Sequence, residues 1–268
     1  MIPTLRRTTR LGAMLGLTSA MMPFYLARTR IAHAQGDEVS VHNTWIRRWA
    51  NLLLPTFGVT LHHTANDTAL TADPPRGRGR LVIANHRSAI DIVVMQALFG
   101  GHLISRGDLS RWPLIGPAAR AVGTLFLDRE NARSGAATLR ALEGWLREGR
   151  TVTLFPEGTT FRGDEVRPFH SAAFVAVARA GAEVVPVGLA YAEGSDASFV
   201  GESFGAHLMR VSAAPRIDLG VSVGAPQLLT DRQHAASFAR TMRHTVQELV
   251  DRSRAHLSHE REAEAPTP

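Results

Sequence analysis

The stretch Leu81-Val82-Ile83-Ala84-Asn85-His86-Arg87-Ser88-Ala89-Ile90-Asp91 joins a short apolar run, a polar turn and the start of a helical pattern. The apolar run is typical of a buried strand, and the residues after Ser88 are typical of a helix. A histidine and an aspartate at such a junction can meet beyond the end of the strand, where the carboxylate can orient the imidazole to take up a proton. We therefore interpret His86 and Asp91 as a candidate base and its partner.

Apolar strand patterns alternate with helical patterns through most of the chain. Strands are predicted over residues 58–61, 80–84, 101–105, 122–127, 151–155, 183–190 and 216–223. Helices are predicted over residues 88–99, 131–148, 170–180 and 232–258. This alternation predicts an α/β fold with a largely parallel central sheet flanked by helices. Since ligands bind beyond the carboxyl ends of the strands in such sheets, His86 and Glu157, each just past a strand, are expected at the same edge.

The first 57 residues differ from this pattern. An apolar stretch over residues 11–27 lies between arginines, and residues 41–57 place two tryptophans at helical spacing beside further arginines. Tryptophan next to arginine is typical of a helix in a lipid headgroup layer, although the same stripe could pack on the protein's own core. The first stretch is short for a spanning helix, which needs about 20 apolar residues, and Ala32-His33-Ala34 leaves open a cleaved signal peptide. We expect a retained, membrane-associated helical segment.

The domain organisation follows from these patterns. We predict membrane-associated helices over residues 1–57, an α/β domain over 58–230, a C-terminal helix packed on it over 231–259, and a frayed tail over 260–268. The 268 residues can hold one substantial core.

Composition excludes several chemistries. The absence of cysteine excludes disulfides, thiolate metal sites and a cysteine nucleophile. All 30 basic residues are arginine, and the net charge of +6 fits an anionic partner such as a phospholipid surface. No metal site is predicted, because the histidines lack a consistent ligand spacing with a second partner. Nucleic-acid binding is not predicted either, since the chain has no aromatic–basic motif for reading bases.

The spacing His-x4-Asp occurs twice, so the spacing alone does not identify a site. His62 and Asp67 form the second copy, in a strand end followed by a polar loop. We interpret that copy as a chance occurrence. The copy at His86 follows a buried strand and is accompanied by downstream segments with polar residues at strand ends. These segments are Gly123–Arg129, Phe155–Thr160 and Val184–Gly188.

With these segments the chain resembles the glycerolipid acyltransferase family, best known from bacterial 1-acyl-glycerol-3-phosphate acyltransferases. The blocks of that family are Asn-His-x4-Asp, Gly-x-x-Phe-x-x-Arg, Phe-Pro-Glu-Gly-Thr and an apolar block containing a proline. All four occur here in order, and the similarity covers roughly residues 80–190. Any single block is a weak signal, whereas the ordered set is specific.

The resemblance implies an O-acyltransferase that moves a fatty acyl group from acyl-CoA or an acyl-carrier protein to a lysophospholipid hydroxyl. The first expected acceptor is 1-acyl-glycerol-3-phosphate, giving phosphatidic acid. His86 would remove the hydroxyl proton, and Asp91 would fix the tautomer and orientation of the ring. Neither a serine nucleophile nor a cofactor is then required. Because acyl donors are made in the cytosol, the expected location is the cytoplasmic face of the inner membrane.

The resemblance also implies residues that bind the substrates or support the site. Arg129 would bind a phosphate with two guanidinium nitrogens at once. The remaining substrate-binding residues are Gly123, Phe126, Glu157, Gly158 and Thr159, and the supporting residues are Asn85 and Pro186. Pro186 interrupts a strand pattern and is expected to mark an edge or a bulge that lines the pocket.

Departures from the family pattern leave the acceptor open. Thr160 and Phe161 precede Arg162, and Phe169-His170-Ser171 stands where many relatives have Phe-Lys-x-Gly. Arg106 lies near a position often held by lysine. These features are closer to acyltransferases for amino-acid-containing lipids, so lyso-ornithine lipid is an alternative acceptor. A thioesterase or lipid hydrolase that uses the same base on water is a further alternative, as is a membrane-bound lipid-binding or scaffolding protein.

Overall fold

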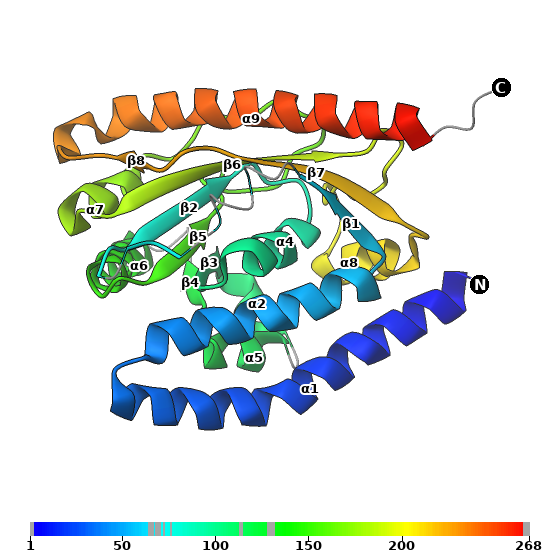
Figure 1. Ribbon diagram of the computed structural model, residues 1–268, viewed down its shortest axis with the longest axis horizontal. Helices are drawn as coiled ribbons and strands as arrows, with labels where there is room; N and C mark the ends of the chain where they lie inside the picture. Colours follow the sequence, from blue (N-terminus) through cyan, green and yellow to red (C-terminus); the bar gives the residue numbers. More distant parts are fainter. Residues whose placement is uncertain are drawn as a thin grey trace.

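The computed structural model describes residues 3–63, 67, 71, 73–75, 77–112, 115–127 and 132–264. Its described strands form one sheet in the order β1-β7-β6-β2-β5-β3-β4, with β8 beside β6 (Figure 1). The strands are β1 (Val59–His62), β2 (Arg80–Ala84), β3 (His102–Arg106), β4 (Leu125–Leu127), β5 (Thr151–Leu154), β6 (Glu183–Tyr191), β7 (Ile217–Val223) and β8 (Gln227–Leu228). Strands β6, β2, β5, β3 and β4 run parallel, whereas β7 and β8 pair antiparallel with β6. The prediction of an α/β fold with a largely parallel sheet is confirmed.

Helices cover both faces of the sheet. They are α1 (Pro3–Gln35), α2 (Glu38–Thr56), α4 (Ile90–Phe99), α5 (Ile115–Ala121), α6 (Ala132–Arg147), α7 (Ala172–Ala180), α8 (Phe204–Ala213) and α9 (Ala235–Glu264), with 3-10 turns η1 (Gly107–Arg111) and η2 (Arg232–His234). Helix α9 runs along one face, and α1, α2 and α4 lie on the opposite side (Figure 1). Helix α9 extends past residue 259, where the sequence predicts a frayed tail.

The apolar run that precedes His86 forms the central strand β2, which is buried on both faces. Leu81 and Ile83 pack in the core formed with α6, α7 and α9, whereas Val82 and Ala84 pack in the core formed with α2 and α4. All four side chains are fully buried. Because both faces of a parallel sheet are covered by helices, its inner strands are apolar at every position rather than at alternate ones.

Helices α1 and α2 form an antiparallel pair that packs on α4 and α8 (Figure 1). Trp49 on α2 donates its indole N–H to Oγ1 of Thr18 on α1 at 3.0 Å. Large apolar side chains remain exposed on this pair, namely Leu5, Leu15, Phe24, Leu26, Ile31 and Leu52. Within the described ranges, none of the helices combines the length and the apolar character that crossing a bilayer requires. Membrane association of this segment stays a prediction.

Pro186 contradicts the expectation of an edge strand. It lies in β6, which is interior to the sheet, and neither of the cavities described below is lined by it. The described registers pair Val184 with β8 and Val187 with β7, so Pro186 falls in the gap between these antiparallel partners. A residue without an N–H is tolerated in the middle of a sheet there, and its carbonyl still accepts from Gly224 N at 2.8 Å.

Two described helices are absent from the sequence-based prediction. Helix α5 contains a proline and a glycine, which read as a turn from sequence alone. Helix α8 has a recognisable N-cap, because Oγ of Ser203 accepts from the amide of Ala206 at 3.2 Å. Both helices border the cavity described below, so the prediction missed parts of the wall of the site.

Candidate active site

His86 and Asp91 meet beyond the end of β2, as the sequence predicts. His86 lies in the turn that follows the strand, and Asp91 lies in the first turn of α4. Nδ1 of His86 is 2.9 Å from Oδ2 of Asp91. The Asp91 side chain is fully buried, whereas 17% of the His86 side chain is exposed. The histidine is therefore the member of the pair that a substrate can reach.

The Asp91 carboxylate is surrounded by hydrogen-bond donors. Oδ2 accepts from the amides of Arg87 at 2.6 Å and Ser88 at 2.8 Å. Oδ1 accepts from the Tyr191 hydroxyl at 2.5 Å. Burial, together with the adjacent Asp91, raises the pKa of Tyr191 well above its usual value, so the phenol keeps the proton it donates.

These contacts assign the two ring nitrogens of His86. A carboxylate only accepts, so Nδ1 carries a hydrogen and donates it to Asp91. Nε2 is then the basic nitrogen, and none of the described residues forms a hydrogen bond with it. The ring also stacks on Phe155 with centroids 4.0 Å apart. The arrangement is that of a general base whose tautomer and orientation are fixed before a substrate binds.

A cleft begins at the His86 ring. Its wall includes Gly158, Thr159 and Thr160 from the loop after β5, and Phe199 and Phe204 from the segment that leads into α8. Gly158 has a φ of 81°, a backbone conformation that suits glycine, and its amide closes a turn onto Phe155 O at 3.0 Å. Of the predicted substrate-binding residues, Gly158 and Thr159 thus lie beside the candidate base.

Glu157 lies under the cleft rather than in its wall. Oε1 accepts from the amide of His86 at 2.8 Å and from Nη1 of Arg87 at 2.9 Å, and Oε2 accepts from the amide of Arg167 at 3.0 Å. The Glu157 side chain is fully buried. Arg87 also donates to the carbonyls of Gly163 and Glu165. Glu157 therefore joins the His86 turn to the loop after β5, and the expected contact with an acceptor stays a prediction.

Asn85 extends the sheet past the end of β2. Its side-chain amide donates to Leu189 O at 2.8 Å, and its Oδ1 accepts from Leu189 N at 2.9 Å. This pair of bonds holds the residue before His86 against β6. The supporting role that the resemblance implies for Asn85 stays a prediction.

The other predicted residues have different placements. Phe126 on β4 lines the large cavity described next. Gly123 lies in the turn before β4 with a φ of 72°, and a Cβ there would lie 2.8 Å from Nδ1 of His102, so its lack of a side chain is required by packing. Arg129, the predicted phosphate ligand, lies outside the described residues.

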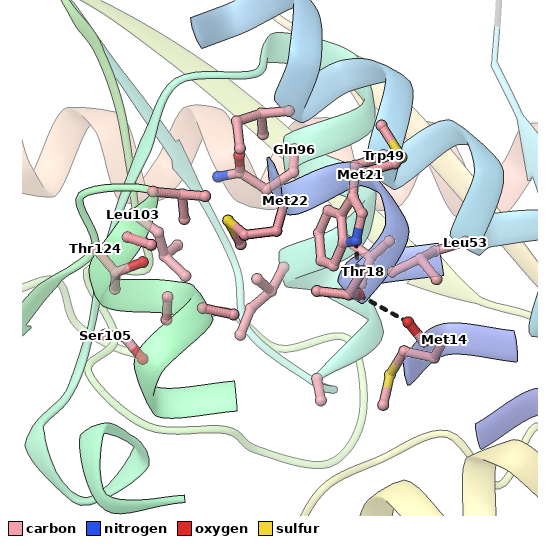
Figure 2. Close-up of a pocket in the computed structure, with 18 of the residues that line it drawn as sticks. Met14, Thr18, Met21, Met22, Trp49, Leu53, Gln96, Leu103, Ser105 and Thr124 are labelled. Atoms are coloured by element: carbon pink, nitrogen blue, oxygen red, sulfur yellow. Dashed lines mark hydrogen bonds between the residues drawn. The ribbon is translucent and has the colours of Figure 1, made fainter. Parts of the chain in front are cut away.

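A large apolar cavity of about 530 Å³ adjoins the His86 cleft. It is enclosed by α1 and α2 on one side and by α4, β3, α5 and α8 on the other (Figure 2). The cavity and the cleft share Ala89, Ile92, Leu103, Ser105 and Phe204. A long apolar group could therefore fill the cavity while a polar group at its end lies beside His86.

Sequence reasoning missed His207, which supports the His86 turn from α8. Its buried Nε2 is 3.2 Å from both the Ala89 amide and Oγ of Ser88, and Nδ1 is 3.1 Å from Oε1 of Glu202. Burial lowers the pKa of His207, which favours the neutral ring. The Ala89 N–H can only donate, so Nε2 accepts and Nδ1 carries the hydrogen. Arg210 Nη2 is 3.2 Å from Nδ1, but it has Glu202 and the Ser198 carbonyl as its acceptors.

Tyr191 and Arg87 were missed as well. Tyr191 ends β6, and Arg87 directly follows the candidate base. No spacing rule joins Tyr191 or His207 to the His86 turn, because Tyr191 lies 100 residues from Asp91 and His207 lies 119 residues from Ser88. The sequence shows that Arg87 follows His86, but only the fold reveals that its guanidinium contacts Glu157.

The second His-x4-Asp copy has other partners. Nε2 of His62 is 2.8 Å from Oδ1 of Asp218, and Oδ1 of Asp67 accepts from the amide of Val223. These contacts join β1 and the chain that follows it to β7. They give this copy a role in the architecture of that end of the sheet.

Comparison with known proteins bears on this site. Residues 66–190 match the family model described as Acyltransferase. The 1-acyl-sn-glycerol-3-phosphate acyltransferase of Neisseria gonorrhoeae is 36% identical over 118 residues, which are 44% of this chain and 46% of that protein. The lyso-ornithine lipid O-acyltransferase of Brucella abortus is 28% identical over 273 residues, which are 93% of this chain and 96% of that protein. The chain thus spans about half the length of the first relative and nearly all of the second.

A solved structure has the same fold. The 1-acyl-sn-glycerophosphate (LPA) acyltransferase PlsC from Thermotoga maritima superposes with a TM-score of 0.67, over 99% of this chain and 100% of that chain, at 17% identity. The matched family model spans both His86 and Asp91, as well as the Phe-Pro-Glu-Gly-Thr loop beside them. Over residues 66–190, which hold the candidate site, this chain is therefore similar to the acyltransferase family.

Proposed function

We propose that this protein transfers a fatty acyl group from the thioester of CoA or of an acyl-carrier protein to the free hydroxyl of a lysophospholipid. The carrying observation is the pairing of His86 Nδ1 with the buried Asp91 carboxylate, which leaves Nε2 accessible at a cleft. The adjoining apolar cavity supports a substrate with a long alkyl chain. Relatives named as 1-acyl-sn-glycerol-3-phosphate acyltransferase and as lyso-ornithine lipid O-acyltransferase support these two lipids as candidate acceptors.

The proposed reaction needs no nucleophile from the protein. As the acceptor oxygen attacks the thioester carbonyl carbon, Nε2 of His86 takes the hydroxyl proton. The resulting tetrahedral intermediate collapses with cleavage of the carbon–sulfur bond, and the proton passes from His86 to the departing thiolate. Asp91 stabilises the transient imidazolium through Nδ1. General-base assistance of this kind is worth about 10²–10⁴-fold in rate.

The acceptor we propose first is 1-acyl-glycerol-3-phosphate, with phosphatidic acid as the product. Arg129 would bind its phosphate through a bidentate contact. Lyso-ornithine lipid is the second candidate, and the alignment with the Brucella abortus relative over nearly the whole chain favours it. The two acceptors differ in charge, because one carries a phosphate and the other an amino acid, so a direct comparison of rates separates them.

We also propose that the α1–α2 pair rests on a lipid surface. Its exposed Leu5, Phe24 and Ile31 alternate with arginines, which suits an interfacial helix pair. Both helices also form a wall of the cavity, so an alkyl chain could pass from the lipid layer into the protein. The cytoplasmic face of the inner membrane is the expected location, because acyl donors are made in the cytosol.

One assay tests the activity. Membranes containing the wild type, His86→Ala or Arg129→Ala receive acyl-CoA with each lyso-acceptor in turn, and thiol release and lipid product are both measured. We expect His86→Ala to abolish turnover. Arg129→Ala should raise the KM of the phosphate-bearing acceptor several-fold, while the exposed Arg140→Ala on α6 serves as the matched control.

Other outcomes would contradict the proposal. Thiol release that does not depend on an acceptor would identify a thioesterase instead. Full activity of His86→Ala would exclude this residue as the base. An unchanged KM for phosphate-bearing acceptors in Arg129→Ala would remove the role assigned to that arginine. Product formed only from lyso-ornithine lipid would select the second acceptor.

A further inference from the structure

Gln96 is a polar side chain at the wall of the large apolar cavity. It lies on α4, is 6% exposed, and borders the cavity together with Leu103 and Met22 (Figure 2). In the described part of the chain, no residue forms a hydrogen bond with its side-chain amide. The Gln96 side chain is thus largely buried, and it lines the cavity with a donor and an acceptor that no described residue pairs.

Two other polar groups of this cavity, on Thr18 and Tyr25, have partners within the protein. Oγ1 of Thr18 donates to Met14 O at 2.7 Å and accepts from the indole of Trp49 (Figure 2). The hydroxyl of Tyr25 is 2.9 Å from Nδ1 of His42. These groups can be covered by an alkyl chain without losing a hydrogen bond. Gln96 differs from them in this respect.

A plain alkyl chain would be a poor neighbour for the amide. When such a chain fills the cavity it displaces water from the amide and offers no hydrogen bond in return, and an unpaired buried amide is unfavourable. A hydroxyl group on the chain would replace the lost water, because it can donate to Oε1 and accept from Nε2. The amide therefore favours an oxygen-bearing chain over a plain one.

We propose that Gln96 is a specificity-determining residue that hydrogen-bonds an oxygen substituent, such as a hydroxyl group, within the acyl chain that fills this cavity. The inference rests on the proposed acyltransferase function and extends it to the class of acyl donor. Thr124, which directly precedes β4, supports it, because Thr124 also lines the cavity and its hydroxyl lacks a hydrogen-bond partner among the described residues (Figure 2).

The position of Gln96 sets where the substituent would lie. Helix α4 begins at Ile90, close to His86, and Gln96 is about one and two-thirds turns further along, which corresponds to about 9 Å of helix length. The thioester carbon would react beside His86, so the substituent would be near the middle of the chain rather than next to the thioester. Met14, Met21 and Met22 of α1 face this region, and methionine side chains adapt readily to chains of different shape.

The test compares two donors that differ by one hydroxyl group. Stearoyl-CoA and a hydroxystearoyl-CoA with its hydroxyl near mid-chain are supplied with a fixed lyso-acceptor to the wild type and to Gln96→Met, which keeps the size of the side chain and removes its hydrogen bonds. For the wild type we expect kcat/KM to favour the hydroxylated donor by roughly fivefold to tenfold, as one hydrogen bond predicts. In Gln96→Met this ratio should fall to about one or below. The same change at the exposed Gln227→Met on β8 should leave the ratio at the wild-type value.

A binding measurement separates this inference from the proposed function. Trp45 and Trp49 line the cavity, so their fluorescence can report the binding of free stearate and of hydroxystearate without turnover. If no acyl transfer occurs with any acceptor, the proposed function fails, and the ratio of the two dissociation constants still decides the role of Gln96. Equal affinity of the wild type for both fatty acids, or a preference that persists in Gln96→Met, would overturn the inference.

Discussion

Tyr191 and His86 bind opposite oxygens of one carboxylate: the Tyr191 hydroxyl donates to Oδ1 of Asp91 at 2.5 Å, and Nδ1 of His86 is 2.9 Å from Oδ2. The last residue of β6 thereby fixes the group that orients the candidate base in the turn after β2. The Asp91 carboxylate cannot rotate without breaking its hydrogen bonds to the turn after β2 and to the last residue of β6. The orientation of the base is consequently tied to two neighbouring strands of the sheet, β2 and β6.

Tyr191→Phe tests this link. The change removes a single hydroxyl and leaves Oδ1 of the buried Asp91 without that donor, so we expect a loss of about 1–3 kcal/mol in the free energy of unfolding. We also expect kcat to fall by about tenfold, which corresponds to ~1.4 kcal/mol in the barrier, with little change in acceptor KM. Kinetics and urea unfolding measure the two effects.

A double-mutant cycle with Asp91→Asn provides the control. If Tyr191 acts through Asp91, the two changes should be clearly non-additive in kcat, because the second removes a carboxylate whose position the first already disturbs. Fully additive effects would contradict the link. A loss of stability without any change in kcat would make Tyr191 a residue of the core only.

The buried Glu157 gives a second prediction. It separates a structural role of this side chain from direct contact with the acceptor. Glu157 joins the His86 amide to the Arg87 guanidinium, and breaking one partner of a buried ion pair costs about 3–5 kcal/mol. Glu157→Gln should therefore lower stability and kcat while leaving the ratio of acceptor to donor KM near the wild-type value. Urea unfolding and steady-state kinetics measure both. A selective rise in the acceptor KM would instead support direct contact between Glu157 and the acceptor.

Sequence reasoning placed these residues at one edge but could not orient their side chains. The apolar run of β2 and the polar residues after β2 and β5 were readable because parallel strands end together, and the registers of Ile83 with Leu154 and Pro186 confirm that adjacency. Whether the Glu157 carboxylate faces the cleft or lies beneath it depends on the position of the Arg87 side chain. The position of Arg87 depends in turn on the folded loop after β5, which has no local sequence signal.

Tertiary contacts account for the rest of what was missed. Tyr191 and His207 contribute through strand pairing and helix packing over long separations, which neither propensity nor spacing encodes. The rule that confines proline to sheet edges failed at Pro186, because β6 changes its partner from β8 to β7 at that residue. A prediction from one sequence has no access to such a change of partner.

His207 supplies a third prediction, in which a conservative variant rescues a disruptive one. His207→Leu removes the acceptor for the Ala89 amide, so the turn between His86 and Asp91 loses a support, and we expect kcat to fall by roughly tenfold. His207→Gln can place a carbonyl oxygen near the position of Nε2 and should recover most of that loss. Steady-state kinetics beside thermal unfolding distinguish positioning from stability. Equal kcat values for the two variants at equal stability would contradict the role.

A stacked histidine pair behind the cavity predicts how stability depends on pH. The rings of His42 and His102 lie with centroids 4.1 Å apart, between α2 and β3. Burial lowers the pKa of His42 to about 4 and that of His102 to about 3, and the nearby Arg150 contributes to both. Both rings are neutral in the folded protein at neutral pH, which lets them stack without charge repulsion.

The sign of the effect follows from proton binding. In the unfolded chain both histidines titrate near pH 6.5, so as the pH falls from about 6.5 towards 4 the unfolded chain takes up protons that the folded protein does not. The free energy of unfolding should therefore fall through this window, by about 3 kcal/mol at pH 4 for His42 alone, and this pair should add no pH dependence above it. Urea unfolding at pH 7 and pH 5 measures the difference. His102→Gln should reduce that difference, whereas the exposed His244→Gln on α9 should not, and equal pH dependence in wild type and His102→Gln would show that the buried pair does not govern acid stability.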